Sequence, residues 1–373
     1  MSSSDIGAGN TMPLQHHGWT GGANQVRVRA YNERLVLSLI RLNGSLSKAD
    51  ITRRSGLSAQ SASVIMRSLE NDGLLLRGEP VRGRVGQPSV PMRLNPDAVY
   101  SFGVKMGRRS ADVILMDFIG GIRLQYHQTY AYPQPEEIMR IITSGIAGIE
   151  EQLTAEERQR IAGVGIAAPF ELWNWADEVG APVGAMDAWR DFDLQAEVGA
   201  AIPYPVYLQN DATSACGAEL VFGVGPAYPD FLYLFIGSFI GGGIVLNSAV
   251  FSGRTGTAGA VGPLAVRGSG GETREPLHIA SIFVLENLLR DHGMDPEPLW
   301  YSADDWIHFG APMGLWIRDS AAALAQAIVA AASIIDFGAA VIDGGFPPWV
   351  RRRLVAATID AANVALNVAV RDA

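Results

Sequence analysis

The chain has 373 residues, of which 48% are hydrophobic and 18% are charged, and its formal net charge is −9. A chain of this length and composition buries several cores, so we expect a globular protein of two or three domains. The single cysteine, Cys216, excludes an internal disulfide and a zinc site built from several cysteines. It fits a reducing compartment, and we expect the cytoplasm.

The charge is unevenly distributed along the chain. Residues 27–98 hold 12 Lys and Arg against 6 Asp and Glu, whereas residues 99–373 hold 17 basic against 31 acidic residues. A basic segment ahead of an acidic body is typical of a nucleic-acid reader joined to a domain with another task. Residues 1–22 have neither a basic start nor an apolar run, so we interpret them as a flexible tail without a signal peptide.

Residues 31–56 predict two helices. Apolar residues recur at helical spacing over residues 31–43, which predicts the first helix. Ser47 then begins a short second helix, with Asp50 three residues later as its capping-box partner and Gly56 at its end.

Ser58 caps a third predicted helix over residues 59–72, which has one apolar and one polar face. Helix, short helix, Gly-containing turn and helix form a helix-turn-helix. Two strand-like runs then flank a basic tip rich in Gly and Pro, as in a wing. The alternative interpretation is a helical protein-interaction module with a solvated arginine-rich loop. The predicted DNA contacts are Ser47, Lys48, Gln60, Ser61, Ser63, Arg67, Arg82 and Arg84.

From Gly22 to Pro96, including the tip VRGRVGQP, the sequence resembles the winged helix-turn-helix of ROK-family repressors. We therefore predict a tail over residues 1–22 and a DNA-binding domain over residues 23–97.

The remaining chain, residues 98–373, predicts an α/β body. Three consecutive strands, a helix and two further strand-helix pairs occupy residues 100–221, and a similar order recurs loosely after Phe231. This order resembles the duplicated actin-like, ribonuclease-H-like fold of ROK sugar kinases. The expected fold class is thus a winged helix-turn-helix followed by a ROK-type ligand-binding body of two α/β subdomains.

Residues 231–251 are apolar and long enough to imitate a membrane span. The glycines at 241–243 and the many β-branched and aromatic residues favour two buried strands joined by a turn. We expect no membrane partner.

The resemblance also shows where this chain departs from the kinases. Lys105 stands in place of the acid that handles metal, and Arg109 stands near the expected Thr; Phe239 replaces a glycine of the second phosphate loop. A glycine pair at 344–345 resembles one that packs near adenosine, but a strand-to-helix turn explains it as well. We therefore predict no enzymatic activity and no cofactor.

The family's sugar and zinc motif is also altered. In GTAGAVGP, Ala260 replaces the Glu that would bind sugar hydroxyls, and Pro263 replaces the His that would bind zinc. The cysteine-rich zinc loop is absent, its place taken by GSGGETREPLHIAS, so we expect no metal.

The motif QNDA matches the family's Asn-Asp-Ala, which assigns Asn210 and Asp211 to a sugar site. Without a phosphoryl donor we interpret Asp211 as an anchor for sugar hydroxyls and not as a base. Its alternative role is the N-cap of a helix over residues 212–221. Further ligand candidates are Glu275 and His278, otherwise a solvated helix start, and Trp189, otherwise a core residue.

The predicted function is that of a sugar-responsive transcription regulator, most simply a repressor, with operator DNA and a sugar or sugar derivative as partners. Because one helix-turn-helix makes few operator contacts, we expect a homodimer or a dimer of dimers. Two alternatives stay open: a ROK sugar kinase, and a DNA-bound regulator that answers to a protein partner.

Overall fold

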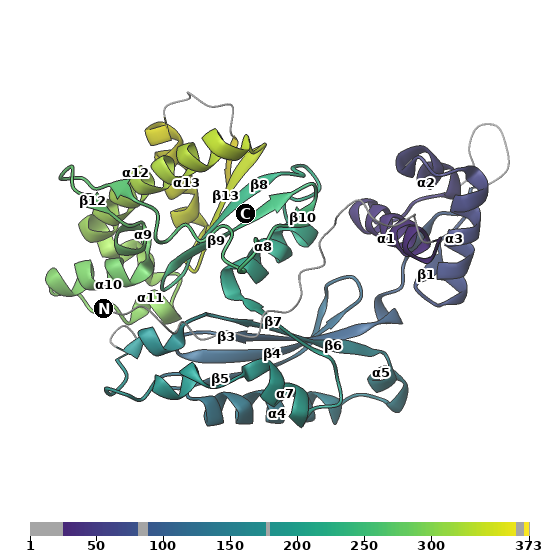
Figure 1. The fold of residues 1–373 in the computed structure, drawn as a ribbon, viewed down its shortest axis with the longest axis horizontal. Helices are drawn as coiled ribbons and strands as arrows, with labels where there is room; N and C mark the ends of the chain where they lie inside the picture. The colour runs from purple at the N-terminus through teal and green to yellow at the C-terminus, as the bar shows by residue number, and fades with distance from the viewer. Residues whose placement is uncertain (1–24, 81–88, 177–179, 363–368, 373) are drawn as a thin grey trace, which may run out of the picture. The chain divides into compact units, whose positions relative to one another are not determined.

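A computed structural model describes residues 25–80, 89–176, 180–362 and 369–372. The chain divides into two compact units, Met1–Asn95 and Pro96–Ala373 (Figure 1). Arg82 and Arg84, the predicted contacts at the tip of the wing, lie outside the described residues.

The first unit is a helix-turn-helix with a short hairpin. Strand β1 pairs with β2 in antiparallel register, and Leu46 adds a bridge to Met92 of β2, with N–O distances of 3.0 and 2.9 Å. This order confirms the three predicted helices and both strand-like runs. The elements are α1 (Gln25–Asn43), α2 (Lys48–Ser55), α3 (Ala59–Asn71), β1 (Leu75–Arg77) and β2 (Met92–Leu94).

Local signals fix the ends of these helices. The Ser47 hydroxyl and the Asp50 carboxylate form the expected capping box at the start of α2. Gly56 ends α2 with φ of 70°, a left-handed conformation that costs a residue without a side chain little. The Ser58 hydroxyl caps α3, whose apolar face is buried in the unit through Ala62, Ile65, Met66 and Leu69.

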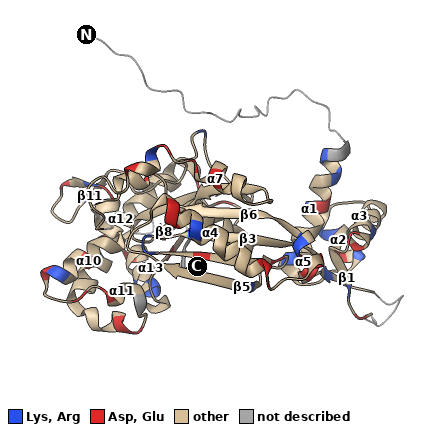
Figure 2. Cartoon of the chain, turned by 90° about the horizontal axis from the view of Figure 1, so that it is seen from below, with Lys and Arg blue, Asp and Glu red and all other residues tan. Residues whose placement is uncertain are grey.

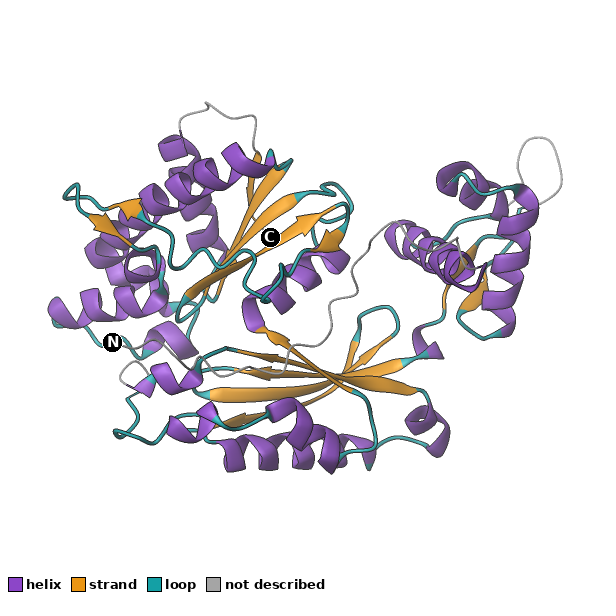
Figure 3. Cartoon of the chain, in the orientation of Figure 1, coloured by secondary structure: helices purple, strands orange, loops and turns teal. Residues whose placement is uncertain are grey.

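The second unit begins with a five-stranded sheet in the order β5-β4-β3-β6-β7. Strands β3, β4 and β5 are antiparallel neighbours, while β6 and β7 run parallel to β3. Helix α4 packs against this sheet beside α7 (Figure 3). The elements are β3 (Tyr100–Met106), β4 (Ser110–Asp117), β5 (Ile122–Thr129), α4 (Pro135–Glu150), α5 (Ala155–Gln159), β6 (Ile161–Ala168), η2 (Leu172–Asn174), η3 (Asp187–Arg190), α7 (Leu194–Ala201), β7 (Val206–Asn210) and α8 (Asp211–Phe222).

A second sheet repeats this arrangement in the order β10-β9-β8-β13-β14, with the same parallel and antiparallel pairings. Counted in chain order, both sheets read 3-2-1-4-5, which supports the predicted duplication. The elements are β8 (Phe231–Ile236), β9 (Ile240–Leu246), β10 (Ala249–Val250), β11 (Val266–Arg267), β12 (Thr273–Arg274), α9 (Leu277–Ala280), α10 (Ile282–Asp291), α11 (Pro298–Tyr301), η4 (Asp305–Phe309), α12 (Gly310–Ile335), β13 (Ala339–Gly344), α13 (Pro348–Ala362) and β14 (Ala369–Asp372).

The apolar stretch at residues 231–251 forms strands β8 and β9 and the two-residue β10, which confirms the strands; the glycines at 241–243 lie within β9 and not in the turn before it. Within the described residues, one helical stretch, Asp305–Ile335, has the length and composition of a membrane span. Trp316, Leu324 and Ile328 of this stretch are buried in the core of the second sheet's subdomain. The core helix of a globular unit has the same composition.

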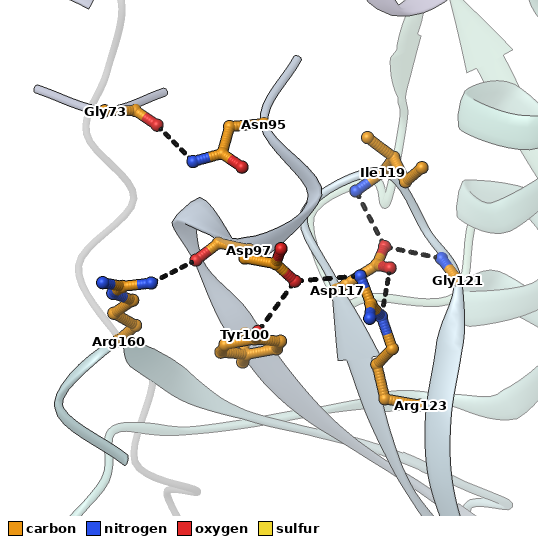
Figure 4. A network of polar contacts seen from close by, with 9 residues as sticks. All are labelled: Gly73, Asn95, Asp97, Tyr100, Asp117, Ile119, Gly121, Arg123 and Arg160. Carbon is orange, nitrogen blue, oxygen red and sulfur yellow. Dashed lines mark hydrogen bonds and ion pairs between the residues drawn. The ribbon is translucent and has the colours of Figure 1, made fainter. Parts of the chain in front are cut away.

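A polar network surrounds the first residues of the second unit (Figure 4). The Asp97 carboxylate accepts hydrogen bonds from Tyr100 and Arg123, each at 3.0 Å, and the Asp97 carbonyl accepts one from Arg160. Arg123 also pairs with Asp117 at 2.6 Å. The 3₁₀ helix η1 (Pro96–Ala98) is thereby tied to the amino ends of β3 and β6.

Candidate functional site

Most predicted DNA contacts on α3 are accessible. Gln60, Ser61 and Arg67 are exposed, and Ser63 is half-buried. The Lys48 ammonium, on α2, reaches the Ser63 hydroxyl at 3.5 Å. Lys and Arg positions lie along α1 and near α2 (Figure 2). The exposed side of α3 can therefore offer hydrogen-bond donors, acceptors and a positive charge to a groove.

Ser47 and Val64 change the expected set. The Ser47 hydroxyl is half-buried and already bonded to Asp50, so it serves as a helix cap first. Val64 was not predicted, yet it is 61% exposed on α3, four residues from Gln60 and three from Arg67. An exposed valine on this face suits contact with thymine methyl groups.

The second unit contains a cavity of about 750 Å³ where the two sheets present their strand ends. In the first sheet, Lys105 is in register with Ala167, and Ala168 with Asn210, so the carboxyl ends of β3, β6 and β7 lie side by side. The β8–β9 turn and Gly345, which follows β13, line it from the second sheet. Ligands of α/β folds bind at such carboxyl ends.

Asn210 and Asp211 lie in the cavity wall, at the junction of β7 and α8. The Asn210 Oδ1 accepts from the N–H groups of Ala212 and Thr213, at 3.1 and 3.2 Å. Asn210 is therefore the N-cap of α8, which corrects the alternative assignment of Asp211 as the cap. Asp211 is the first helical residue instead.

The Asp211 carboxylate has spare hydrogen-bonding capacity. Its Oδ1 accepts from the Ala212 N–H at 2.8 Å, and no side chain among the described residues donates to either oxygen. Burial raises the pKa of Asp211, and the Ala212 N–H and the Lys105 charge offset part of that rise. A half-buried carboxylate beside a free Asn210 amide can accept from one ligand hydroxyl while the amide donates to the next.

Three basic residues line the cavity at and after the end of β3: Lys105 in the strand itself, and Arg108 and Arg109 in the β3–β4 turn. The Gly107 N–H donates to the Ser110 carbonyl at 2.8 Å, which closes the turn. The Tyr130 hydroxyl lies 2.6 Å from the Gly107 carbonyl and 2.8 Å from that of Ser110. This buried tyrosine holds the backbone of the turn and so positions the Cα atoms that carry Arg108 and Arg109.

Arg108 joins the two subdomains. Its Nη1 donates to Glu286 Oε2 on α10 at 3.0 Å, with only 8% and 6% of the two side chains exposed. The guanidinium lies over the Trp300 ring, 5.3 Å from its centroid, and the Trp300 N–H donates to Glu286 at 2.9 Å. The Arg108 Nε is buried without a hydrogen-bond partner among the described residues.

The corresponding turn of the second sheet, between β8 and β9, is aromatic. Phe239 packs edge-on against Trp175, with ring centroids 4.5 Å apart, and against Phe283, at 5.4 Å. The glycines that follow serve packing: a Cβ on Gly241 would lie 2.7 Å from that of Ala212, and one on Gly243 would lie 2.6 Å from that of Cys216. Helix α8 needs them to approach β9 closely.

The altered motifs have clear positions. Ala260 and Pro263 both line the cavity, so its wall is apolar where the resemblance implies Glu and His. The hairpin of β11 and β12 occupies the place expected for the zinc loop. Gly344 ends β13 and α13 follows from Pro348, which confirms a strand-to-helix turn at the glycine pair.

Three predicted ligand residues do not line the cavity. Trp189 is 5% exposed, packs edge-on against Phe192, and donates its N–H to the Pro133 carbonyl at 2.9 Å, so it is a core residue. Glu275 and His278 face solvent and lie 3.9 Å from each other. Only the neighbouring Leu277 reaches the cavity.

Sequence reasoning missed Arg108, Glu286, Trp175 and Trp300. Arg108 adjoins Arg109 in GVKMGRR, so its position was a signal that went unused. The pair with Glu286 spans 178 residues, and no local pattern indicates it.

Comparison with known proteins agrees with this geometry. Residues 29–75 match the family model described as winged helix-turn-helix DNA-binding, and residues 101–274 match that of the ROK family. The xylose repressor of Bacillus subtilis (strain 168) is 25% identical over 244 residues, 65% of this chain and 62% of the repressor. The transcriptional dual regulator NagC of Escherichia coli (strain K12) is 22% identical over 73% of this chain and 65% of its own. Both alignments thus span less than two thirds of the relative.

Solved structures share the fold. A ROK family transcriptional regulator, a homologue of the E. coli MLC protein, matches with a TM-score of 0.64 at 18% identity over 92% of both chains. A ROK family glucokinase from Streptomyces griseus, in complex with glucose and AMPPNP, matches with a TM-score of 0.55 at 21% identity, over 73% of this chain and 94% of the kinase. The likeness to the regulator covers nearly the whole chain, and the likeness to the kinase covers about three quarters of it.

Proposed function

Because the chain carries a ROK-family domain behind a winged helix-turn-helix, we propose that it is a sugar-responsive transcription regulator, most simply a repressor. The observation that carries the proposal is one chain holding both an exposed polar helix of DNA-reading type and a cavity with a free carboxylate. The resemblance to named repressors supports it.

In the proposed DNA complex, α3 lies in a major groove. Gln60, Ser61 and Ser63 contact base edges, Val64 contacts a thymine methyl, and Arg67 contacts a phosphate. Lys48, the first residue of α2, contacts the DNA phosphate backbone. Ser47 supports this contact as the N-cap of α2. Arg82 and Arg84 stay proposed wing contacts. The proposed DNA-binding domain spans residues 23–97, and residues 98–373 form the ligand-binding body.

We assign the cavity to a small polyhydroxylated ligand. Asp211 accepts from its hydroxyls and Asn210 donates to them, while Trp175 and Phe170 offer apolar faces in the wall. The body is not a kinase in this proposal, because Lys105 brings positive charge where a metal-binding acid is needed and Phe239 fills the second phosphate loop. No metal or nucleotide cofactor is required.

The proposed regulator is a cytoplasmic homodimer or dimer of dimers, because operator half-sites are usually read by symmetric pairs. Ligand binding shifts the body between two arrangements that differ in operator affinity. A protein signal in place of a sugar is the alternative outcome of the test.

The test begins with DNA, because the operator is unknown. The full chain is used to select binding sites from a random duplex pool, and we expect enrichment of one inverted-repeat site. Arg67→Ala then weakens binding to that site and lowers the slope of log K against log salt by about one. Arg140→Ala, on α4 of the body, is the control. Failure to enrich any DNA site would refute the proposal that the chain is a transcription regulator.

The selected site then serves to find the effector. Sugars and sugar derivatives are screened for release of the DNA by the wild type and by Asp211→Ala. Release that depends on Asp211 supports the assigned cavity, whereas DNA binding that no compound alters favours the protein-signal alternative.

A further inference from the structure

We propose that the ligand of the cavity carries an acidic group, a carboxylate or a phosphate, and that Arg108 holds this group together with Lys105 and Arg109. The inference rests on the proposed function, because it names the chemical class of the effector. It is carried by the unused donors of one arginine and by two exposed cations, Lys105 and Arg109, in the cavity wall.

The Arg108 guanidinium has one committed donor. Nη1 bonds to Glu286, while Nε is buried and lacks a partner among the described residues. Nε and the adjacent Nη2 form the side edge of the guanidinium, which matches two oxygens of a carboxylate or phosphate. A buried charged donor without an acceptor is unfavourable, so an oxygen that reaches this edge is strongly favoured.

Glu286 orients the Arg108 guanidinium through Nη1 and leaves the Nε edge without a bond. Its Oε1 accepts from the Trp300 N–H at 2.9 Å and lies 3.6 Å from Arg290. The single charge of Glu286 is thus shared between two arginines and leaves part of the Arg108 charge uncompensated. Glu286 and Trp300 are positioning residues for Arg108.

The wall adds further positive charge. Lys105 and Arg109 are exposed in the cavity, and neither has an ion-pair partner among the residues that the structure describes. The acidic residues of the lining are Glu171 and Asp211. Glu286 pairs with Arg108, so Lys105 and Arg109 are the two cations of the wall that have no ion-pair partner among the described residues, and low-dielectric walls strengthen their field on an entering anion.

The two sets of residues recognise different parts of one molecule. Arg108 and Arg109 project from the β3–β4 turn toward the acidic group, whereas Asn210 and Asp211, at the start of α8, suit hydroxyls. A neutral sugar would offer no negative charge to Lys105, to Arg109 or to the unpartnered Nε edge of Arg108. The ligand class is therefore a sugar phosphate or a sugar acid.

The experiment compares matched sets of compounds on the full chain: glucose, glucose 6-phosphate and glucuronate, and the corresponding sets for galactose, mannose and N-acetylglucosamine. Thermal shift identifies binders, and calorimetric titration gives Kd. We expect an acidic member of at least one set to bind at least ten times more tightly than its neutral counterpart. A response to the phosphates alone or to the uronates alone identifies the source of the acidic group.

The variants test the residues. Lys105→Gln/Arg109→Gln removes two exposed, unpaired charges, so it should fold normally, and we expect it to raise Kd for the acidic compound at least ten-fold. Arg108→Lys keeps a cation near Glu286 but loses the planar edge of the guanidinium. We expect this variant also to raise Kd for the acidic compound. The control is Arg140→Gln, whose side chain is 53% exposed on α4 and does not line the cavity.

Three results would overturn the proposal: equal or tighter binding of the neutral sugar, no acidic binder in any set, or an unchanged Kd in Lys105→Gln/Arg109→Gln. The same preparations are tested on the selected DNA site without ligand. If they bind DNA while acidic compounds fail, the ligand class is wrong and the regulator stands. If DNA binding itself fails, the proposed function is wrong.

Discussion

The β3–β4 turn and the β8–β9 turn occupy the same place in two sheets of identical strand order, yet their chemistry is opposite. The first carries Arg108 and Arg109, with Lys105 just before it at the end of β3; the second carries Phe239, which packs against both Trp175 and Phe283. Both turns line one cavity. The duplicated fold thus places two turns at equivalent positions beside the cavity. The residues in each turn, and not the fold, decide which ligand groups the cavity can bind.

The largest expected effect on stability comes from replacing Arg108, the buried arginine of the β3–β4 turn. Arg108→Ala leaves Glu286, with 6% of its side chain exposed, short of its main partner. We expect the free energy of unfolding to fall by about 3 kcal/mol, because an uncompensated buried charge is costly. Urea unfolding followed by tryptophan fluorescence reports on this unit, since every tryptophan except Trp19 lies within it.

The neighbouring Arg109→Ala is the matched control. Its side chain is exposed and unpaired among the described residues, so the change should stay within about 0.5 kcal/mol. Equal losses in both variants would show that the pair with Glu286 contributes nothing to stability.

A smaller effect is expected from the aromatic turn. Phe239→Gly removes the edge contacts to Trp175 and Phe283 and should lower the free energy of unfolding by about 2 kcal/mol. It should not create MgATP-dependent sugar phosphorylation, because Lys105 remains. Phe251→Gly, at a residue that is 48% exposed, is the control for the stability measurement. If Phe239→Gly did phosphorylate a sugar, Phe239 alone would be what prevents kinase activity, and the stated effect of Lys105 would be wrong.

The smallest effect concerns the carboxylate between the turns. Burial raises the pKa of Asp211, so stability from this group is full below the pKa of the unfolded carboxyl and is lost as pH rises through the folded value. Asp211→Asn cannot ionise, so we expect its free energy of unfolding at neutral pH to exceed that of the wild type, while ligand binding is lost.

The gain in Asp211→Asn should vanish in acid, which unfolding curves at several pH values would show. Asp191→Asn, at an exposed position outside the cavity, is the control for the substitution itself. A neutral-pH loss in Asp211→Asn would contradict the stated cost of burial.

Signals that lie within a few residues were readable from the sequence. Ser47 with Asp50, Gly56 and Ser58 marked the ends of α2 and α3, because capping is a local interaction. The same reasoning failed by one residue at α8, where Asn210 and Asp211 are both good caps and only the backbone distinguishes them. The family resemblance supplied the duplicated order of strands.

Features that depend on distant packing were not readable. Trp175 and Trp189 are alike in sequence context, but one lines the cavity and the other is a core residue bonded to Pro133. The Arg108–Glu286 pair joins a turn to a helix of the other subdomain, so composition and periodicity carry no trace of it.

The network around Asp97 has a mechanical consequence. Strand β3 runs from Tyr100, which donates a hydrogen bond to Asp97, to Lys105 in the cavity wall, a span of about 17 Å at the usual rise per residue. Arg160, at the start of β6, holds the same residue, and β6 ends beside the cavity at Ala168. Paired strands keep a fixed length along their axis, so β3 and β6 set the distance between the cavity wall and Asp97. That residue stands two positions after the end of the first unit, so the strand pair connects the cavity to the chain junction between the units.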